Sequence, residues 1–370
     1  MKILLVGGAV RDLLLGRPVR DFDFLVIGAS EEEFMEQFPE ARQVGRDFPV
    51  FLHQGHEFSF PRAEGVDGDL AARDLTINAL ALDEQGELYA HPQAIEDLHD
   101  RVLRPCSPDS FRRDPLRVFR SARMWAWLPG FRPHIELLES MREAGFRPGV
   151  LESLPRERVA GECLKAFEGI RPSRFIMLLH KGTCLSPWFQ EIEGADRIPA
   201  GPAPFHNETL LGHICDTMDQ LAGDPLKVWM GFCHDLGKKN TDSDILPHHY
   251  GHEKRGEILA KDLGERLGLP VKYIRAGAIA AGKHMTGGQY PSLRPGTRVD
   301  LLMLLHSKDL LEPFFRVVRA DDGEDYLPQA KEDLKTILSV HLPEKDRNLG
   351  AASGEKLRDL RAQALAEKNP

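Results

Sequence analysis

Residues 2–28, KILLVGGAVRDLLLGRPVRDFDFLVIG, decide the fold. The apolar residues 3–6 predict a short strand, and the glycine pair after them interrupts it and leads into one or two turns of helix. Residues 20–27 predict a second strand. Strand side chains alternate between faces, so Asp21 and Asp23 would point the same way, with aromatic rings on the other face.

Two carboxylates on one face, Asp21 and Asp23, would repel each other unless a cation lay between them. A hard dication such as Mg²⁺ suits such a pair, and the bare backbone N–H of Gly8 at a helix start suits a phosphate. Each feature alone has a plainer interpretation, since a glycine pair is usually a turn and Asp-x-Asp is usually solvated surface. Here the aspartates alternate with apolar residues on a half-buried strand, where unpaired carboxylates need a reason. The combination predicts nucleotidyl transfer.

The rest of the first hundred residues predicts further strands and one helix. Residues 31–43 predict an amphipathic helix with acidic residues in its first turn. Residues 50–53 and 57–60 predict two strands joined by a turn. Glu57 would lie near the aspartates, either as a third carboxylate or as a partner that fixes a loop or an arginine. Residues 61–72 carry charges and small turn residues and predict a loop.

Residues 109–127, DSFRRDPLRVFRSARMWAW, predict an arginine-rich helix. Arg117, Arg120 and Arg123 recur every three residues and would form a ridge along one side, with Asp114 near its start. The simplest interpretation is an amphipathic helix with a solvated arginine face. With the aspartate pair upstream, the ridge instead predicts recognition of bases and phosphates, because arginine makes bidentate contacts to both.

Composition places the chain among soluble globular proteins, with 370 residues, of which 42% are hydrophobic and 28% charged. This length predicts two or three domains. No apolar run is long enough to span a membrane, and the apolar start is too short for a signal peptide. The five cysteines include no Cys-x-x-Cys pair, which argues against a disulfide framework or a cysteine zinc site and favours a reducing cytoplasm.

The net charge of −9 is unevenly distributed along the chain. It is −12 over residues 1–100, +6 over residues 101–174 and −3 over the remainder. The overall acidity argues against indiscriminate nucleic-acid binding, but the basic segment permits one docking face for RNA.

A second set of candidate ligands lies between residues 205 and 325. The doublet His234-Asp235 falls in the apolar stretch GFCHDLGK, which predicts a helix ending at Gly237, and such a doublet inside an apolar helix is hard to explain as surface. Imidazole with carboxylate suits a transition metal better than Mg²⁺; a purely packing role is the alternative. His248 and His249 are expected to be solvated. The spaced residues that could join the doublet are His213, His252, His284 and Asp321.

The first motif resembles a known family. GGAVRD followed by RDFDF resembles the head of the class II tRNA nucleotidyltransferases, the CCA-adding enzymes and their poly(A) polymerase relatives. Residues 72–81, ARDLTINALA, resemble the RRDxTxNA stretch of that family, with Ala72 where an arginine is common. Thr76 and Asn78, flanked by apolar residues, are expected to be polar supports of a buried strand. The resemblance is strongest over residues 1–165.

The resemblance implies an α+β fold, in which a small nucleotidyltransferase head with a mixed β-sheet and flanking helices is followed by an all-α remainder. The implied parts are a catalytic head (1–105), a helical neck that binds base and RNA (106–170), a helical body (171–204), an HD domain (205–325) and a helical C-terminal tail (326–370).

The implied activity is template-independent addition of C residues, and of the terminal A, to the 3′ end of tRNA from CTP and ATP with release of pyrophosphate. Asp21 and Asp23 would be catalytic and would bind two Mg²⁺ ions, and the acceptor stem of tRNA would dock on a monomer or homodimer. Asp114 and Arg117 would read the incoming base. The nucleotide-binding residues carried over from the family are Gly8, Arg11, Arg73, Asp114, Arg117, Arg120 and Arg123.

The histidine and aspartate residues of the second set resemble the HD phosphohydrolase superfamily, whose domains are attached to some members of this family. The implied activity is that of a 2′,3′-cyclic phosphodiesterase and phosphatase, with a divalent transition metal such as Ni²⁺, Mn²⁺ or Co²⁺. His252 and His284 would be second-site or substrate groups. The implied metal ligands are His213, His234, Asp235 and Asp321.

Two departures from the family pattern leave the exact reaction open. Only residues 65–72 separate Arg62-Ala63-Glu64 from Arg73, where full CCA-adding members carry a long flexible loop, and a short loop is a mark of members that add only CC. Arg113 stands where a glutamate commonly precedes the base-reading aspartate. A poly(A) polymerase and an HD phosphohydrolase with a nucleotide-binding head are also compatible with the motifs. A non-enzymatic RNA-binding protein is the remaining possibility, and the aspartate pair argues against it.

Overall fold

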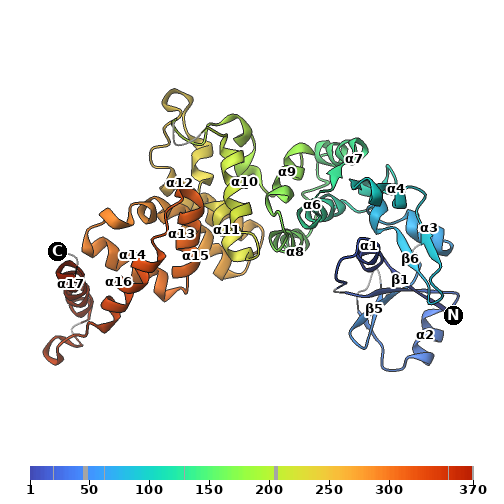
Figure 1. Cartoon of the computed structure of the whole chain (residues 1–370), viewed down its shortest axis with the longest axis horizontal. Helices are drawn as coiled ribbons and strands as arrows, with labels where there is room; N and C mark the ends of the chain where they lie inside the picture. The colour runs from blue at the N-terminus through green and yellow to red at the C-terminus, as the bar shows by residue number, and fades with distance from the viewer. Residues whose placement is uncertain are drawn as a thin grey trace. The chain divides into compact units, whose positions relative to one another are not determined.

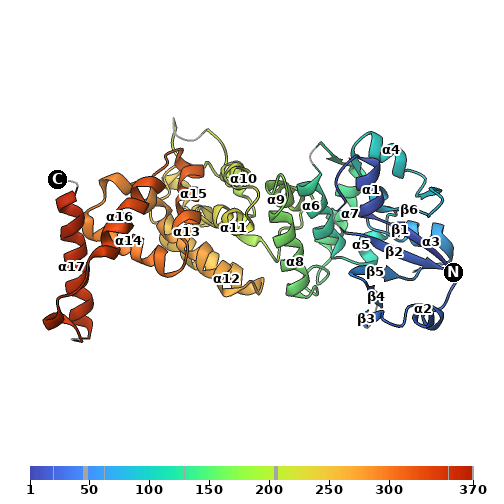
Figure 2. The ribbon, with the colours of Figure 1, turned by 60° about the horizontal axis from the view of Figure 1, so that its bottom comes forward.

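The computed structural model describes every residue except 20, 45–48, 62, 129, 204–206, 349, 369 and 370. It divides into two compact units, one formed by residues 1–154 with 177–187 and the other by residues 155–176 with 188–370. The first contains the main β-sheet and is called the sheet unit; the second is called the helical unit (Figures 1 and 2).

The sheet unit is built on a seven-stranded sheet with the strand order β3-β4-β5-β2-β1-β6-β7. β2 and β5 are parallel, and the other neighbouring pairs are antiparallel. The predicted mixed sheet is therefore confirmed. Its strands are β1 (Lys2–Val6), β2 (Asp23–Ile27), β3 (Arg42–Val44), β4 (Val50–His53), β5 (His56–Ser59), β6 (Leu80–Leu82) and β7 (Leu88–Ala90).

Apolar side chains bury both faces of the central strands. Because successive residues of a strand face opposite sides, β2 sends Leu25 into a core cluster with Leu4 and Val26 into a second cluster with Phe34. The remaining elements of the sheet unit are α1 (Gly8–Leu14), α2 (Glu31–Gln37), α3 (Gly65–Ala71), η1 (Thr76–Asn78), α4 (Ala94–His99), β8 (Val102–Leu103), α5 (Ser110–Arg113), α6 (Arg117–Trp127), β9 (Arg132–Pro133) and α7 (Ile135–Phe146).

The second predicted strand is shorter than expected. Residues 20–27 were predicted as a strand, but β2 begins at Asp23, and Asp21 precedes it as an exposed residue; Arg20 lies outside the described residues. The reason is the partner strand: Val6 pairs with Asp23, and the chain turns away at Gly7, where φ is 71°. Asp21 therefore has no residue of β1 opposite it.

The helix predicted for residues 31–43 ends early. Ser30 caps α2 in a capping box with Glu33, and the helix stops at Gln37. Pro39 explains the stop, because a proline disfavours helical geometry in the residue before it. The end of the predicted helix instead forms the strand β3.

The loop predicted for residues 61–72, which includes the short loop 65–72, is wrong over most of its length. Residues Gly65–Ala71 form the helix α3, and Arg62 lies outside the described residues. Val66 and Leu70 pack against the core cluster of Leu4. Burial of these two side chains outweighs the low helix propensity of the glycines around them.

The two motif stretches that follow also differ in detail. Thr76 and Asn78 lie on the 3₁₀ turn η1 rather than on a strand. The arginine-rich segment is two helices, α5 and α6, because Asp114 adopts an extended conformation before Pro115.

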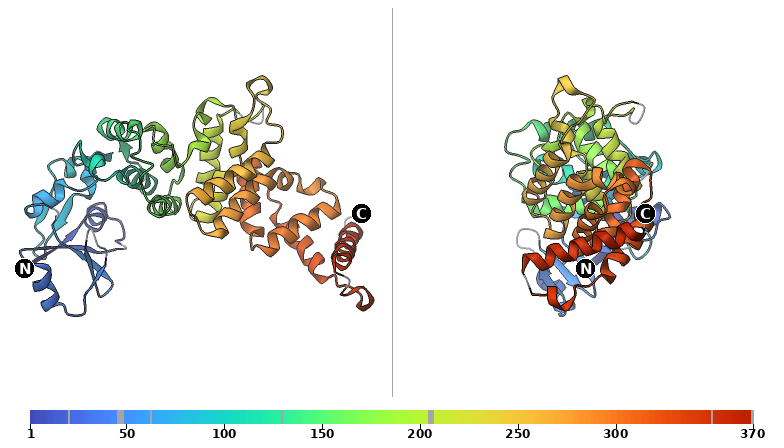
Figure 3. Two further views of the ribbon diagram at one scale, coloured as in Figure 1. Left: turned by 180° about the vertical axis from the view of Figure 1, so that it is seen from behind. Right: turned by 90° about the vertical axis from the view of Figure 1, so that its left-hand side faces the viewer.

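The helical unit agrees with the predicted all-α remainder. Its C-terminal helix α17 lies against α14 and α16 (Figure 3). No helix in the described ranges is long and apolar enough to cross a membrane. The elements are α8 (Arg156–Phe167), α9 (Ser173–Lys181, shared with the sheet unit), η2 (Gln190–Ile192), η3 (Ala195–Arg197), α10 (Leu210–Gln220), α11 (Pro225–Cys233), η4 (Leu236–Asn240), η5 (Ser243–Ile245), α12 (His252–Arg266), α13 (Val271–Gly288), η6 (Tyr290–Ser292), α14 (Pro295–Ser307), α15 (Leu311–Asp322), α16 (Leu327–Ser339), η7 (Glu344–Asp346) and α17 (Ala351–Lys368).

Candidate functional site

Carboxylates gather where β2 begins. Asp23 pairs with Glu57 of the parallel strand β5, so both side chains lie on the same face of the sheet. Partial desolvation and the nearby carboxylates of Glu57 and Asp21 raise the pKa of Asp23. Arg73 and Arg120 act in the opposite direction but do not cancel this effect. A cluster of acidic groups that resists ionisation is a suitable site for a dication.

The glycine pair lets two guanidinium groups approach the backbone. Gly7 has φ of 71° and precedes α1, and a Cβ atom there would lie 3.0 Å from Nη1 of Arg73. A Cβ atom on Gly8 would lie 3.4 Å from Nη2 of Arg11. The start of α1 therefore brings bare backbone together with positive charge, a combination that suits phosphate.

Arg11 and Arg73 are both held in place by acidic partners. Arg11 is buried; its Nη2 lies 3.0 Å from Oδ2 of Asp12, and its Nη1 donates to the side-chain oxygen of Asn78 at 2.6 Å. Arg73 forms an ion pair with Asp69 of α3 at 3.0 Å. The helix α3, which was not predicted from the sequence, thus positions Arg73.

Asp74, which had no predicted role, anchors this network. It is buried, accepts from the Leu75 N–H at 2.8 Å and from the Asn78 amide at 3.2 Å, and lies 3.3 Å from Nη2 of Arg120. Burial opposes ionisation, but Arg120 and these hydrogen bonds outweigh it and lower the pKa of Asp74 to about 2. The carboxylate therefore fixes Arg120 beside the acidic cluster.

The arginine ridge does not form a uniformly solvated face. Arg117 is buried, and its guanidinium donates to Oγ of Ser110 at 2.6 Å, to the Ala72 carbonyl at 2.6 Å and to the Arg73 carbonyl at 3.1 Å. A solvated face is therefore the wrong interpretation for this residue. Asp114 accepts from the Leu116 N–H just before α6. The remaining ridge residues, Arg120 and Arg123, are half-buried on α6.

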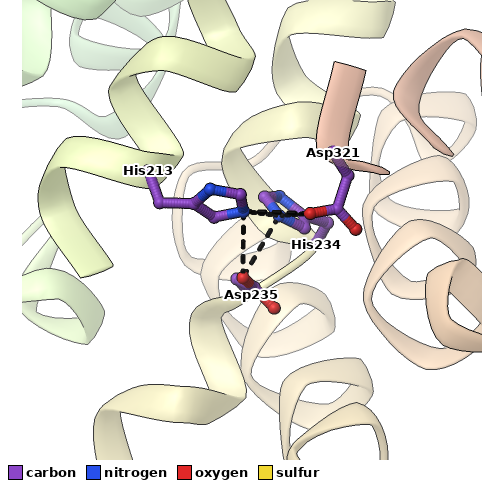
Figure 4. Close-up of side chains that lie close together, drawn as sticks. All are labelled: His213, His234, Asp235 and Asp321. Atoms are coloured by element: carbon purple, nitrogen blue, oxygen red, sulfur yellow. Dashed lines mark hydrogen bonds and ion pairs between the residues drawn. The ribbon is translucent and has the colours of Figure 1, made fainter. Parts of the chain in front are cut away.

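Four residues of the second set of candidate ligands converge inside the helical unit, namely His213, His234, Asp235 and Asp321 (Figure 4). Nε2 of His213, on α10, lies 3.1 Å from Nε2 of His234 and 3.0 Å from Oδ1 of Asp321, on α15. Oδ2 of Asp235 lies 3.4 Å from Nε2 of His213 and 3.3 Å from Nε2 of His234. The doublet sits at the end of α11, which stops at Cys233, rather than inside a helix reaching Gly237.

Two more histidines lie on the other side of Asp235. Its Oδ1 is 3.4 Å from Nε2 of His252, the first residue of α12, and 3.4 Å from Nε2 of His284, on α13. The two Nε2 atoms are 3.1 Å apart. We call the six residues His213, His234, Asp235, His252, His284 and Asp321 the His-Asp centre.

Burial gives the His-Asp centre unusual electrostatics. His234 and Asp235 are fully buried. Burial alone would lower the pKa of His234, but the carboxylates of Asp235 and Asp321 raise it to about 10. Nζ of Lys238, a residue that the sequence did not indicate, lies 2.6 Å from Oδ2 of Asp235. Burial opposes the ionisation of Asp235, and Lys238 and His234 nevertheless hold its pKa well below the usual range.

Comparison with known proteins identifies the family. Residues 3–54 match the poly(A) polymerase head domain family. The multifunctional CCA protein of Pseudomonas fluorescens is 38% identical over 397 aligned positions, which cover 100% of this chain and 93% of that protein. This chain belongs to the multifunctional CCA protein family. The family member of Aromatoleum aromaticum is also 38% identical, over 82% of this chain and 79% of that protein.

Solved structures share the fold of this multifunctional CCA protein family member. The Bacillus stearothermophilus CCA-adding enzyme in complex with CTP covers 99% of this chain and 93% of its own, with a TM-score of 0.64 and 21% identity. The structure of a CCA-adding enzyme with ATP matches 98% of this chain and 86% of the enzyme's own chain, with a TM-score of 0.66 and 20% identity. The predicted resemblance to the class II tRNA nucleotidyltransferases is confirmed, and the chain is an enzyme of that class.

Some of the site residues that were not predicted do have signals in the sequence. Asp74 follows Arg73 directly, and Lys238 follows Asp235 by three residues, one turn along the chain. His249, expected to be solvated, is buried, and its ring contacts the Pro199 carbonyl at 2.9 Å and Oγ1 of Thr241 at 2.8 Å. That expectation was wrong because one of the partners of His249, the Pro199 carbonyl, is distant in sequence.

Proposed function

We propose that this member of the multifunctional CCA protein family adds C, C and A to the 3′ end of tRNA, using CTP and ATP and releasing pyrophosphate. The observation that carries the proposal is the acidic cluster of Asp21, Asp23 and Glu57 beside the start of α1. A relative named multifunctional CCA protein matches the whole chain. CCA-adding enzymes of similar fold have been solved with CTP and with ATP. The Thermotoga maritima CCA-adding enzyme has been solved with tRNA; it matches 100% of this chain and 92% of its own chain, with a TM-score of 0.58 and 18% identity.

The raised pKa of Asp23 supports a magnesium site, since a dication relieves the repulsion among these carboxylates. Mg²⁺ held by Asp21 and Asp23 would lower the pKa of the primer 3′-hydroxyl and neutralise charge on the triphosphate. Glu57 is placed to support the same cluster.

The basic residues of the sheet unit would bind the nucleotide. Gly8 would offer its backbone N–H to a phosphate, and Arg73 lies against the neighbouring glycine with its guanidinium already oriented by Asp69. Arg120 is oriented in the same way by Asp74. Arg11 and Arg123 would add further positive charge for the triphosphate.

Asp114 and Arg117 would choose the base, with the arginine donating to a cytosine's carbonyl and ring nitrogen and the aspartate accepting from its amino group. Arg117 would have to exchange some of its hydrogen bonds to Ser110 and the 72–73 carbonyls for this. The basic neck would hold the acceptor stem through phosphate and shape. The five cysteines are free and buried, which suits the reducing cytoplasm we propose for the enzyme.

Product length tests this proposal. Purified protein is incubated with tRNA lacking its last three nucleotides and with CTP alone, ATP alone or both, and products are resolved on a sequencing gel. We expect two added nucleotides with CTP and three with both. A product that stops at two with both nucleotides would identify a CC-adding enzyme, and a long A tail would identify a poly(A) polymerase. No extension under any condition would contradict nucleotidyl transfer.

We propose that residues 205–325 form an HD domain that hydrolyses 2′,3′-cyclic phosphodiesters and phosphomonoesters. The carrying observation is the convergence of two imidazoles and two carboxylates, all buried or nearly so, from α10, the end of α11 and α15. Such a ligand set suits Ni²⁺, Mn²⁺ or Co²⁺. A metal there would supply hydroxide at neutral pH by lowering the pKa of bound water.

Hydrolysis of 2′,3′-cyclic AMP with added Ni²⁺, Mn²⁺ or Co²⁺ tests this second activity. Asp235→Ala should abolish hydrolysis while leaving nucleotide addition intact, and Asp23→Ala should do the reverse. The exposed His248 provides a control, since His248→Ala should hydrolyse normally. Absence of hydrolysis with every metal, in protein that still adds nucleotides, would reduce the His-Asp centre to a packing role.

A further inference from the structure

We propose that an exposed surface between α1 and α6 binds the unpaired nucleotides that precede the 3′ end of the tRNA. The surface consists of Leu14, the last residue of α1, Arg17 just beyond it, and Arg123 and Trp127 of α6; we call it the α1–α6 surface. The inference rests on the proposed nucleotide addition and adds to it the place where the primer lies.

Both helices of the α1–α6 surface start at the nucleotide site and meet again at their far ends. The backbone at the start of α1 lies against the guanidinium of Arg73, and Arg117, the first residue of α6, donates to the Arg73 carbonyl at 3.1 Å. Beyond the end of α1, Nη2 of Arg17 donates to the carbonyl of Trp127, the last residue of α6, at 3.3 Å. The surface is therefore continuous with the nucleotide site, and all of it belongs to the sheet unit.

An apolar side chain is exposed where α1 approaches α6. Nη1 of the buried Arg11 lies 3.5 Å from Sδ of Met124, which marks the side of α1 that faces α6. Leu14 follows Arg11 by three residues, so it lies on the same side of the helix, one turn further along. Leu14 is 51% exposed. Covering it with a base or a ribose would remove apolar area from water, which is favourable.

The α6 helix adds an aromatic ring and positive charge to this apolar position. Trp127 is half-buried, and Arg123 lies one turn before it on the same side of α6. Nε of Arg17 lies 4.0 Å from Oδ1 of Asp12, which also pairs with Arg11. The three arginines thus carry more charge than this carboxylate offsets. Aromatic and apolar side chains for the bases, combined with arginines for the phosphates, are typical of surfaces that bind single-stranded RNA.

The length of α1 indicates which nucleotides the surface would bind. Leu14 lies about 9 Å along the helix axis from Gly8, at ~1.5 Å per residue, and this is the length of about two or three stacked nucleotides at ~3.4 Å each. The 3′-hydroxyl has to lie at the acidic cluster beside Gly8, so the surface would receive the nucleotides that precede the terminal one. Because each addition lengthens the unpaired tail, the surface should contribute more to the binding of a tRNA with a longer tail.

Addition of CMP to two primers tests this dependence on tail length. Wild type and Leu14→Ser are compared with CTP as the only nucleotide, on tRNA lacking its last three nucleotides and on tRNA lacking its last two. Leu14→Ser should raise the KM for the longer primer about tenfold, since an apolar contact is lost, and the KM for the shorter primer much less. The control is Val44→Ser, because Val44 is also exposed but lies on the edge strand β3, four strands away from β1; it should change neither KM. An equal change on the two primers, or none, would overturn the inference.

Photocrosslinking of the wild-type chain gives a readout that depends neither on a variant nor on nucleotide addition. The tRNA would carry a photoreactive thiouridine directly before its 3′-terminal nucleotide, and crosslinked peptides would be identified by mass spectrometry. Crosslinks within residues 12–17 or 123–128 would support the inference, and their absence from both segments would overturn it. Crosslinks at these residues in a protein that adds no CMP would refute the proposed function alone. A changed elution volume of Leu14→Ser on gel filtration, with equal KM values for the two primers, would assign the surface to a second copy of the chain and overturn the inference.

Discussion

Asp74→Asn should destabilise the sheet unit by an amount that depends on pH. The substitution preserves the shape of the side chain and an acceptor for the Leu75 N–H, but it removes the charge that faces Arg120. The pKa of Asp74 is lowered from 3.8 to about 2 by Arg120 and by its hydrogen bonds, against the effect of burial. Lowering the pKa from 3.8 to about 2 corresponds to about 2.5 kcal/mol of stability.

The sign of the pH dependence follows from the lowered pKa. The folded state favours the ionised form of Asp74 more strongly than the unfolded state does, so the contribution is complete above about pH 5. It is lost as the pH falls from about 4 towards 2. The difference in unfolding free energy between wild type and Asp74→Asn should therefore be largest at neutral pH and should shrink markedly by pH 3.

Urea titrations at pH 7, 5, 4 and 3 would measure this difference. Pulsed hydrogen–deuterium exchange would follow peptides of the sheet unit separately from those of the helical unit, because two compact units need not unfold together. The exposed Asp109, which forms an ion pair with Arg112, gives the control Asp109→Asn. A gap between wild type and Asp74→Asn that is equal at pH 7 and pH 3, or no larger than that of the control, would refute the reasoning.

Three further substitutions test other parts of the molecule. Asp23→Asn should reduce nucleotide addition at least ~10³-fold in a single-turnover assay while tRNA binding persists, since it weakens the metal site; near-normal addition would count against the assignment. Thr76→Val removes the buried hydrogen bond to Asp97 (2.7 Å) and should lower the unfolding free energy of the sheet unit by about 1–3 kcal/mol, measured in urea; an unchanged midpoint would contradict this. Gly237→Ala would place a Cβ atom on the first carbonyl of α12, so metal binding and the melting temperature of the helical unit should fall, whereas Gly354→Ala, with open space around it, should change neither.

The central sheet was predictable because its signals are local. Residues 3–6 are apolar, the glycine pair marks the turn, and β2 alternates into two core clusters, which is the pattern of a strand buried on both faces. The expected proximity of Glu57 to Asp23 is met because β5 lies beside β2 in the sheet, a pairing of strands that are not consecutive in the sequence.

The predictions that failed depend on contacts between distant residues. α3 contains glycines and acidic residues that predict a loop, and only the burial of Val66 and Leu70 against the sheet makes it helical. The role of Asp74 depends on Arg120, on a helix much further along the chain. The partners of Lys238 and His249 include backbone carbonyls near residue 200. Periodicity in a single sequence carries no information about such pairings.

The hydrogen bonds of Arg117 connect two tasks that are usually considered separately. Its guanidinium holds the carbonyls of Ala72 and Arg73, and Arg73 is the residue proposed to meet the triphosphate. If Arg117 turns towards an incoming base, the peptide that carries Arg73 loses a restraint at the same moment. A base that Arg117 does not engage would leave the Arg73 peptide in its resting position, and fidelity would be expressed as slower turnover rather than as weaker affinity.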